Sequence, residues 1–191
     1  THPHEFNLDS IVNISSSELS KLSSLKKPNK HIAVFHHKDQ VLQKQNFYLV
    51  FDRINDPGNL GTIIRTCHWF GVDQIICSVD SVDCYNSKVV QSSMGSLSKV
   101  NVVYTDLIKF IKTTNKKIIG TSLNSKSISD YSFQNFDGII VFGSESNGIS
   151  REIKKEINDY ISIPKTASNS TAESLNLSIS VAIFLSKIKG I

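Results

Sequence analysis

Residues 47–66 of this 191-residue chain read FYLVFDRINDPGNLGTIIRT and carry its clearest structural pattern. The first five residues form an unbroken β-prone apolar run, which is typical of a strand buried on both faces of a parallel sheet. Asp56-Pro57-Gly58 is a tight-turn signal, and Asn59 is placed to cap the helix that follows. We expect this helix over residues 60–70, ending at Gly71. The stretch therefore predicts one strand–turn–helix unit.

Strand and helix patterns continue to alternate along the rest of the chain. Further strands are expected at residues 74–78, 100–104, 117–121, 138–142 and 160–163, and further helices at residues 86–93, 106–114, 150–158 and 174–187. This alternation predicts an α/β domain with a mainly parallel sheet flanked by helices.

The first 30 residues differ from the rest, since they are rich in serine, asparagine and lysine. Ser15 precedes Glu18 at capping-box spacing, which predicts a short helix over residues 15–22. Residues 31–35 have the pattern of a brief apolar strand, and a polar stretch follows. The chain begins with Thr1 rather than methionine, so we expect that sequence upstream has been removed.

The composition is that of a globular protein, because 39% of the residues are hydrophobic and 20% are charged. These values exclude disordered and fibrous classes. The net charge of +4 permits a polyanionic partner without demanding one. Cys67, Cys77 and Cys84 lack paired C-x-x-C spacing, so we expect no zinc site and a reducing, cytoplasmic compartment. No stretch approaches the length of a membrane span, so no membrane partner is expected.

The helix expected after Asn59 has one apolar face. That face consists of Leu60, Ile63, Ile64, Cys67 and Phe70. Gly61 and Arg65 lie on the opposite side, four residues apart, so the arginine is expected to hang over the glycine. Free N–H groups at a helix start, overhung by a guanidinium, would bind a phosphate or another anion. The alternative is that Asn59 is only a cap and Arg65 only a solvated surface charge.

A second segment, GIIVFGSESNG at residues 138–148, is a buried strand that runs into a glycine-bracketed loop with one carboxylate, Glu145. Gly143 and Gly148 have the spacing of a P-loop, but Ile149 follows where that motif has lysine, which disfavours a nucleoside triphosphatase. No G-x-G-x-x-G occurs in the chain, which disfavours the usual dinucleotide fold. The segment is equally compatible with a ligand loop and with a plain strand-to-helix turn.

A third segment joins Ile163-Pro164, a polar loop, and the sequence ESLNLSISVAIFL at residues 173–185. In the helix expected there, Asn176, Ser180 and Lys187 form a narrow polar stripe, and apolar residues cover nearly all the rest. Such a helix is either enclosed by its own domain or shared with a second subunit. The sequence pattern leaves both alternatives open.

These three segments, in this order, resemble the three motifs of the SPOUT superfamily, and specifically of the SpoU/TrmH-type RNA 2′-O-ribose methyltransferases. The matching residues are NDPGNLG at 55–61 with Arg65-Thr66, FGSE at 142–145 with Gly148, and Ile163-Pro164 with SLNLS at 174–178. The resemblance extends from residue 47 to the C-terminus. The loop at residues 165–173 departs from the family pattern, because it is longer than usual and contains no glycine.

The resemblance implies a SPOUT fold, in which the C-terminal segment of the α/β domain forms a trefoil knot, a rare exception to the rule against knotted chains. It implies S-adenosyl-L-methionine as the cofactor, bound by loops after three strands, and a homodimer with the active site at its interface. It also implies that residues 43–191 are the methyltransferase domain, and that residues 1–42 are a remnant of an N-terminal RNA-binding domain with its linker. The implied cofactor contacts are Thr121, Ser122, Leu123, Gly143, Ile163 and Leu175.

The implied activity is transfer of a methyl group to an RNA ribose 2′-hydroxyl, without a metal ion. Ribosomal RNA is preferred over transfer RNA by analogy with enzymes that carry such N-terminal modules. The implied catalytic residues are Arg65, Asn59, Glu145, Ser174 and Asn176. Because arginine holds its proton too tightly to act readily as a base, we expect Arg65 to grip the target phosphate. The alternatives are a tRNA 2′-O-methyltransferase, a SPOUT enzyme that modifies a base nitrogen, and a non-catalytic RNA-binding assembly protein of this fold.

Overall fold

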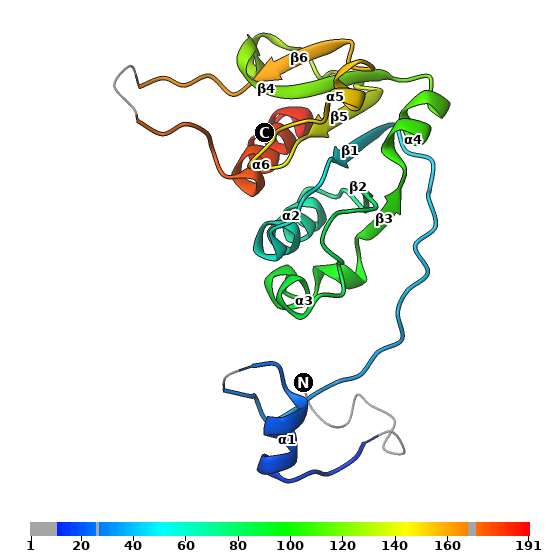
Figure 1. Ribbon diagram of the computed structural model, residues 1–191, viewed down its shortest axis with the longest axis vertical. Helices are drawn as coiled ribbons and strands as arrows, with labels where there is room; N and C mark the ends of the chain where they lie inside the picture. The colour runs from blue at the N-terminus through cyan, green and yellow to red at the C-terminus, as the bar shows by residue number, and fades with distance from the viewer. Residues whose placement is uncertain (1–10, 26, 168–170) are drawn as a thin grey trace. The chain divides into compact units, whose positions relative to one another are not determined.

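Figure 1 shows the computed structural model, which describes residues 11–25, 27–167 and 171–191. The chain divides into two compact units, Thr1–Asp39 and Gln40–Ile191. Among the described residues, no helix combines the length and the apolar character needed to cross a lipid bilayer.

The described part of the first unit contains helix α1 (Ser16–Leu22), as its capping box predicts. The Glu18 N–H donates to Ser15 Oγ at 3.3 Å, and the Ser15 N–H donates to the Glu18 carboxylate at 2.8 Å. The prediction of a strand at residues 31–35 is wrong. Val34 and Phe35 are 91% and 78% exposed, and no described strand pairs with them to satisfy their backbone groups.

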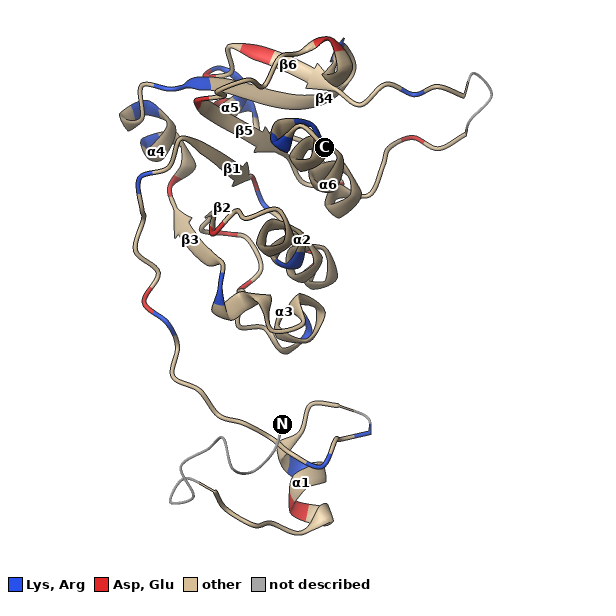
Figure 2. Ribbon diagram, turned by 180° about the vertical axis from the view of Figure 1, so that it is seen from behind, with Lys and Arg blue, Asp and Glu red and all other residues tan. Residues whose placement is uncertain are grey.

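The second unit is built on a six-stranded sheet in which every pairing is parallel. The strands are β1 (Phe47–Phe51), β2 (Gln74–Ser78), β3 (Asn101–Thr105), β4 (Lys117–Ser127), β5 (Gly138–Phe142) and β6 (Asp159–Ser162). Their order across the sheet is β3-β2-β1-β5-β4-β6. Strands β1, β2 and β5 carry no charged residue (Figure 2), as expected of strands that are covered on both faces. The α/β class with a parallel sheet is confirmed.

Helices cover both faces of this sheet (Figure 1). They are α2 (Pro57–Trp69), α3 (Ser87–Ser93), α4 (Leu107–Thr113), α5 (Arg151–Lys154) and α6 (Leu177–Lys189), with the short 3-10 turns η3 (Ser96–Ser98) and η4 (Ile128–Asp130). Successive residues of β1 point to opposite faces: Leu49 belongs to the core with α2 and α6, and Val50 to the core with α4 and α5. Both side chains are 0% exposed, so the sheet separates two apolar cores.

Three expected helices have boundaries that differ by more than one residue in the structure, and α2 begins at Pro57 rather than at residue 60. Helix α6 begins at Leu177 rather than at residue 174, since the Asn176 side chain accepts the Ser178 N–H at 2.9 Å and caps the helix. Helix α5 ends at Lys154 rather than at residue 158. Its continuation is prevented because Asn158 pairs with Ile118, donating its N–H at 2.9 Å and accepting the Ile118 N–H at 2.8 Å. Side-chain–backbone bonds of this kind compete with helix formation and are invisible to apolar periodicity.

Gly61 is buried where α2 meets α3, so the expectation that it lies under Arg65 in an open anion site is wrong. A Cβ atom at this position would lie 1.9 Å from Ser92 Oγ and 2.7 Å from the Val89 carbonyl oxygen. Ser92 Oγ also donates to the Pro57 carbonyl oxygen at 3.2 Å. The glycine is therefore needed for the close approach of the two helices.

We expect Gly61→Ala to destabilise the protein by about 1–3 kcal/mol, the usual effect of adding a methyl group to a filled core. Helix propensity alone predicts the opposite sign, because alanine is better than glycine by about 1 kcal/mol. Equilibrium unfolding in urea measures the difference. Adding Ser92→Ala removes the nearest contact but not the Val89 carbonyl, so the double variant should recover only part of the loss. A neutral or stabilising Gly61→Ala would contradict the close packing.

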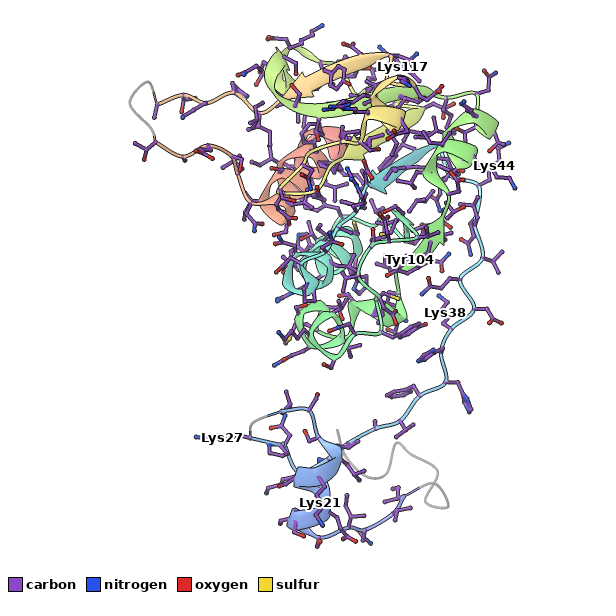
Figure 3. The ribbon with its side chains drawn as sticks, in the orientation of Figure 1. Lys21, Lys27, Lys38, Lys44, Tyr104 and Lys117 are labelled. Carbon is purple, nitrogen blue, oxygen red and sulfur yellow. The ribbon has the colours of Figure 1, made fainter. Side chains whose placement is uncertain are left out.

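The cysteines Cys67, Cys77 and Cys84 are free and buried. Burial raises the pKa of each thiol above its ordinary value. Burial also raises the pKa of Tyr104, at the end of β3 (Figure 3), whose hydroxyl donates to the Val82 carbonyl oxygen at 2.7 Å. Thiols in such surroundings stay protonated and pack as small core residues, as expected for Cys67 and Cys77.

Candidate active site at the carboxyl edge of the sheet

The neighbouring strands β1 and β5 mark the point at which the chain reverses its direction across the sheet. After β1 the chain enters α2 on one face of the sheet, and after β5 it enters α5 on the other face (Figure 1). The two connections therefore diverge at the carboxyl ends of these strands. In open α/β sheets, ligands bind outside the strands at such a point.

Three side chains from distant segments are hydrogen bonded there. Asn59 Nδ2 donates to Glu145 Oε1 at 2.5 Å, and Asn176 Nδ2 donates to Asn59 Oδ1 at 2.9 Å. The bonded pairs are separated by 86 and 117 positions in the sequence. We call Asn59, Glu145 and Asn176 the polar bridge. It joins the first turn of α2, the loop after β5 and the start of α6.

The contacts of Asn176 with α6 determine how the amide groups of the polar bridge are oriented. Asn176 Oδ1 accepts the N–H groups of Ser178 at 2.9 Å and of Ile179 at 3.4 Å, so only its amide nitrogen can face Asn59. Asn59 then presents its oxygen to Asn176 and its nitrogen to Glu145. Glu145 Oε2 has no hydrogen-bond partner among the described residues, so this oxygen is available to a ligand.

Asp56, not Asn59, caps α2. The Asp56 carboxylate accepts the Asn59 N–H at 2.7 Å, and Pro57 occupies the first helical position. The expected role of Asn59 as a cap is therefore wrong, because its side chain lies inside the first turn and takes part in the polar bridge. The capping carboxylate also occupies the helix start at which an anion was expected.

The loop that carries Glu145 is a tight hairpin with two backbone bonds. The Ser144 N–H donates to the Gly148 carbonyl oxygen at 3.2 Å, and the Gly148 N–H donates to the Ser144 carbonyl oxygen at 2.9 Å. A Cβ atom at Gly143 would lie 2.1 Å from the Gly148 carbonyl carbon, and Gly148 has a φ of +63°. Backbone geometry therefore requires both glycines, which explains their P-loop-like spacing.

Asp52 fixes the far end of the same loop, and sequence reasoning missed it. The residue is 3% exposed, and its carboxylate accepts the Ser150 N–H at 2.6 Å and the Arg53 Nε–H at 3.2 Å. The Asp52 N–H donates to the Phe142 carbonyl oxygen at 2.9 Å. An acidic residue directly after a buried parallel strand is the sequence signal that could have identified it, because a buried carboxylate needs hydrogen-bond partners.

Arg65 and Ser174 are exposed and are not hydrogen bonded to the polar bridge. Within the described chain, the Arg65 guanidinium has neither an ion pair nor a hydrogen bond, and the Ser174 hydroxyl has no hydrogen bond. Arg65 shares helix α2 with Asn59, and Ser174 lies two residues before Asn176. An unpaired guanidinium on this helix is suited to bind a phosphate.

Strand β4 continues past its expected end and contains a looped-out segment. Thr121 and Lys126 both align with Ile161 of β6, so residues 122–125 leave the regular pairing. Ser125 Oγ is buried in this segment without a hydrogen-bond partner among the described residues. The segment therefore holds a polar atom that a ligand could satisfy.

Of the residues expected to hold a cofactor, three lie within β4 where its regular pairing with β6 is interrupted, and the others follow β5 and β6 or precede α6. They are Thr121, Ser122, Leu123, Gly143, Ile163 and Leu175. Since β5, β4 and β6 are neighbours in a parallel sheet, the first five residues gather at one edge. Leu123 and Leu175 are 65% and 49% exposed, so both offer apolar surface to a ligand.

The order of the three segments is that of the SPOUT-type RNA methyltransferases which they resemble, and the polar bridge joins one residue from each segment. Residues 46–186 match the sequence profile of the SpoU rRNA Methylase family. The chain belongs to this family, so the recognition from three motifs is confirmed.

Individual relatives have more specific names. The chain is 28% identical over 182 residues to the 23S rRNA (guanosine(2553)-2′-O)-methyltransferase RlmP of Bacillus subtilis, covering 93% of this chain and 71% of that protein. It is 37% identical over 142 residues to the 23S rRNA (guanosine-2′-O-)-methyltransferase RlmB of Blochmanniella floridana, covering 72% of this chain and 54% of that protein. The structure of the SpoU methyltransferase AviRb from Streptomyces viridochromogenes, in complex with the cofactor AdoMet, aligns with a TM-score of 0.67 and 26% identity over 78% of this chain and 61% of that one. The chain therefore spans only part of each relative, about half in the case of RlmB.

Proposed function

We propose that this protein transfers a methyl group from S-adenosyl-L-methionine to a ribose 2′-hydroxyl of RNA, and that the RNA is ribosomal rather than transfer RNA. The observation that carries the proposal is the polar bridge, which brings one residue from each of the three motifs into a single hydrogen-bonded unit. The names of RlmP and RlmB support ribosomal RNA as the substrate.

The cofactor supplies a methyl group that is activated by a sulfonium centre. Its binding is assigned to Thr121, Ser122, Leu123, Gly143, Ile163 and Leu175. The chemistry of these positions fits, because the exposed leucines offer apolar surface to a purine and Ser125 Oγ lacks a partner among the described residues. The AdoMet in the AviRb complex supports the same cofactor here.

The reaction is an in-line displacement, so the protein mainly has to align the ribose hydroxyl with the methyl donor. Alignment of reactants can be worth about 7–11 kcal/mol. In this proposal Arg65 binds the phosphate of the target nucleotide and places its ribose. The polar bridge holds Glu145 so that Oε2 can accept a hydrogen bond from the 2′-hydroxyl. Ser174, two residues before Asn176, completes the set around the ribose.

Three further features of the family are proposed for this chain. The C-terminal segment of the α/β domain is assigned a trefoil knot. Residues 43–191 are assigned to the methyltransferase domain and residues 1–42 to the remnant of an RNA-binding domain with its linker, which the division of the chain after Asp39 supports. A cytoplasmic location is supported by the three free, buried cysteines.

The active form is proposed to be a homodimer. Its support is a shallow apolar groove of about 440 Å³ along η4 and α6, lined mainly by Ile128, Ile179, Ala182, Ile183 and Ile191. Ile179 and Ile191 are 51% and 85% exposed. Exposed isoleucines on the last helix and directly after it suit a second copy of the chain, because large apolar patches on protein surfaces mark contact sites.

Light scattering coupled to gel filtration should give the mass of a dimer. Ile179→Glu places a charge in the groove and should shift the protein to a monomer with reduced methyl transfer. Val90→Glu is the matched control, because Val90 is 45% exposed on α3 and does not line the groove. A fully active monomer would contradict the proposed interface.

Two measurements test the proposed reaction itself. Calorimetric titration with S-adenosyl-L-methionine should show binding, whereas a protein that binds RNA but no cofactor would be the non-catalytic assembly factor. Mass spectrometry of nucleosides from RNA incubated with the protein and cofactor should detect 2′-O-methylated ribose. Methylation of a base, or of transfer RNA but not ribosomal RNA, would contradict the corresponding part of the proposal.

A further inference from the structure

Arg53 has an unusual backbone conformation directly after β1. In the described chain, the non-glycine residues with positive φ are Arg53 at +58°, Met94 at +50°, Asn115 at +34° and Asn135 at +52°. Asparagine tolerates this region, and Met94 forms the left-handed cap that ends α3. Neither reason applies to Arg53, which is not asparagine and ends no helix. Such an outlier at a ligand-binding edge indicates a functional constraint.

The surrounding residues hold both the backbone and one edge of the Arg53 side chain. The Arg53 N–H donates to Ser78 Oγ at 2.8 Å, at the end of β2. Its Nε–H donates to Asp52 Oδ1 at 3.2 Å, while Asp52 Oδ2 accepts the Ser150 N–H at 2.6 Å. Both oxygens of the Asp52 carboxylate are therefore engaged, and the guanidinium is anchored through Nε.

The two terminal nitrogens of Arg53 remain available. The side chain is 33% exposed, and within the described chain neither Nη1 nor Nη2 has a hydrogen-bond partner. A guanidinium that is anchored at one edge presents its other N–H groups in a rigid fork, which matches the oxygens of a phosphate or a carboxylate. The terminal N–H groups of Arg53 therefore favour an anionic ligand.

We propose that Arg53 is a second anion-binding residue of the site and that its ligand is a backbone phosphate of the substrate RNA. The inference rests on the proposed function. Two anions are available to such a site, an RNA phosphate and the carboxylate of the cofactor. Arg53 is bonded to β2, on the opposite side of β1 from β5, β4 and β6, where the cofactor residues are assigned. This placement favours the phosphate.

Arg53→Gly tests the proposal, because glycine accepts the left-handed backbone, and this gain offsets part of the loss of the bond to Asp52 Oδ1, so the variant should still fold. We expect its affinity for a fluorescently labelled single-stranded oligoribonucleotide to fall roughly tenfold. The slope of log K against log salt should decrease by about 1, the signature of one lost phosphate contact. Calorimetry should find the affinity for S-adenosyl-L-methionine unchanged.

Two control variants separate the effect of the guanidinium geometry of Arg53 from the effect of its positive charge. Arg53→Lys keeps the charge and should keep the salt slope while losing part of the affinity. Lys109→Ala removes one exposed positive charge from α4, on the sheet face opposite α2, and should leave the RNA affinity nearly unchanged. If Lys109→Ala loses as much RNA affinity as Arg53→Gly, then any positive charge contributes regardless of its place, and the proposal is overturned.

The remaining outcomes distinguish this inference from the proposed function. If the parent protein binds and methylates RNA while Arg53→Gly keeps the same affinity and salt slope, the inference alone is overturned. If Arg53→Gly loses cofactor affinity and keeps RNA affinity, the anion is the cofactor carboxylate and the phosphate assignment is wrong. If the parent protein binds no RNA at all, the proposed function and the inference both fail.

Discussion

Replacing Arg65 by alanine is expected to lower kcat/KM for RNA methylation by about 10²- to 10³-fold, the usual effect of removing one side-chain donor that stabilises the transition state. The guanidinium is exposed and has no ion pair or hydrogen bond within the described chain. Its loss should therefore change the free energy of unfolding by no more than about 0.5 kcal/mol. A large loss of activity with no loss of stability would identify Arg65 as a residue that serves ligand binding rather than folding.

Kinetics of methyl transfer to RNA and calorimetry with S-adenosyl-L-methionine measure the two sides of this prediction. Cofactor affinity should be unchanged, because Arg65 is assigned to the phosphate of the RNA. Arg65→Lys should retain part of the activity, since a point charge replaces the bidentate fork. Near-normal methyl transfer by Arg65→Ala, with cofactor binding intact, would remove the catalytic assignment.

The second large effect is expected from Asn59→Asp, which changes a single amide group into a carboxylate. Asn59 Nδ2 donates to Glu145 Oε1 at 2.5 Å, so the variant places two carboxylates in direct contact. Two such groups cannot both ionise without strong repulsion, and one of them then holds a proton to a higher pH than usual. We expect methyl transfer to fall at least tenfold at neutral pH. Because Glu145 is exposed and water screens the repulsion, the free energy of unfolding should fall by no more than about 1 kcal/mol.

The loss of stability in Asn59→Asp should depend on pH in one direction. Repulsion exists only while both carboxylates are ionised, so the stability deficit of Asn59→Asp is present at high pH and disappears as the pH falls through the raised pKa of the pair. Unfolding in urea at several pH values should therefore show the variant approaching the parent on acidification. A deficit that is independent of pH would contradict direct contact between positions 59 and 145.

A double variant provides the matched control for this prediction. Combining Asn59→Asp with Glu145→Gln restores one charge and one amide, now in reversed positions, while Asn176 Nδ2 keeps its acceptor. Stability should recover. If activity does not recover with it, the charge of Glu145 is needed at its own place, next to the ribose. If Asn59→Asp alone keeps the parental rate, the polar bridge has no role in the reaction.

Strand positions were largely predictable. Phe47–Phe51, Gln74–Ser78 and Gly138–Phe142 lie where their apolar runs predict, because a strand covered on both faces must be apolar at every position. Helix boundaries were less predictable. Asn55 and Asp56 both precede α2, and Ser174 and Asn176 both precede α6, so only the backbone geometry shows that Asp56 and Asn176 are the caps.

The candidate site was also predictable only in part. The three motifs identified Asn59, Glu145 and Asn176 as functional residues, but no pattern indicated which of their atoms meet. Asp52 and Arg53 were missed, because their roles depend on a buried carboxylate and a left-handed backbone that only the neighbouring strands impose.

By itself, the amino-acid sequence determined where the chain forms strands and which segments carry its chemistry. Only the tertiary structure decided that the Asn59 amide connects two distant segments and that Gly61 serves the contact of α2 with α3. It also decided that Arg53 Nε bonds the Asp52 carboxylate while the terminal nitrogens have no partner in the described part of the chain. The reason is physical. Periodicity reports on neighbours within a few residues, whereas the decisive contacts join positions 86 and 117 residues apart, and the order of strands in the sheet sets which of these meet.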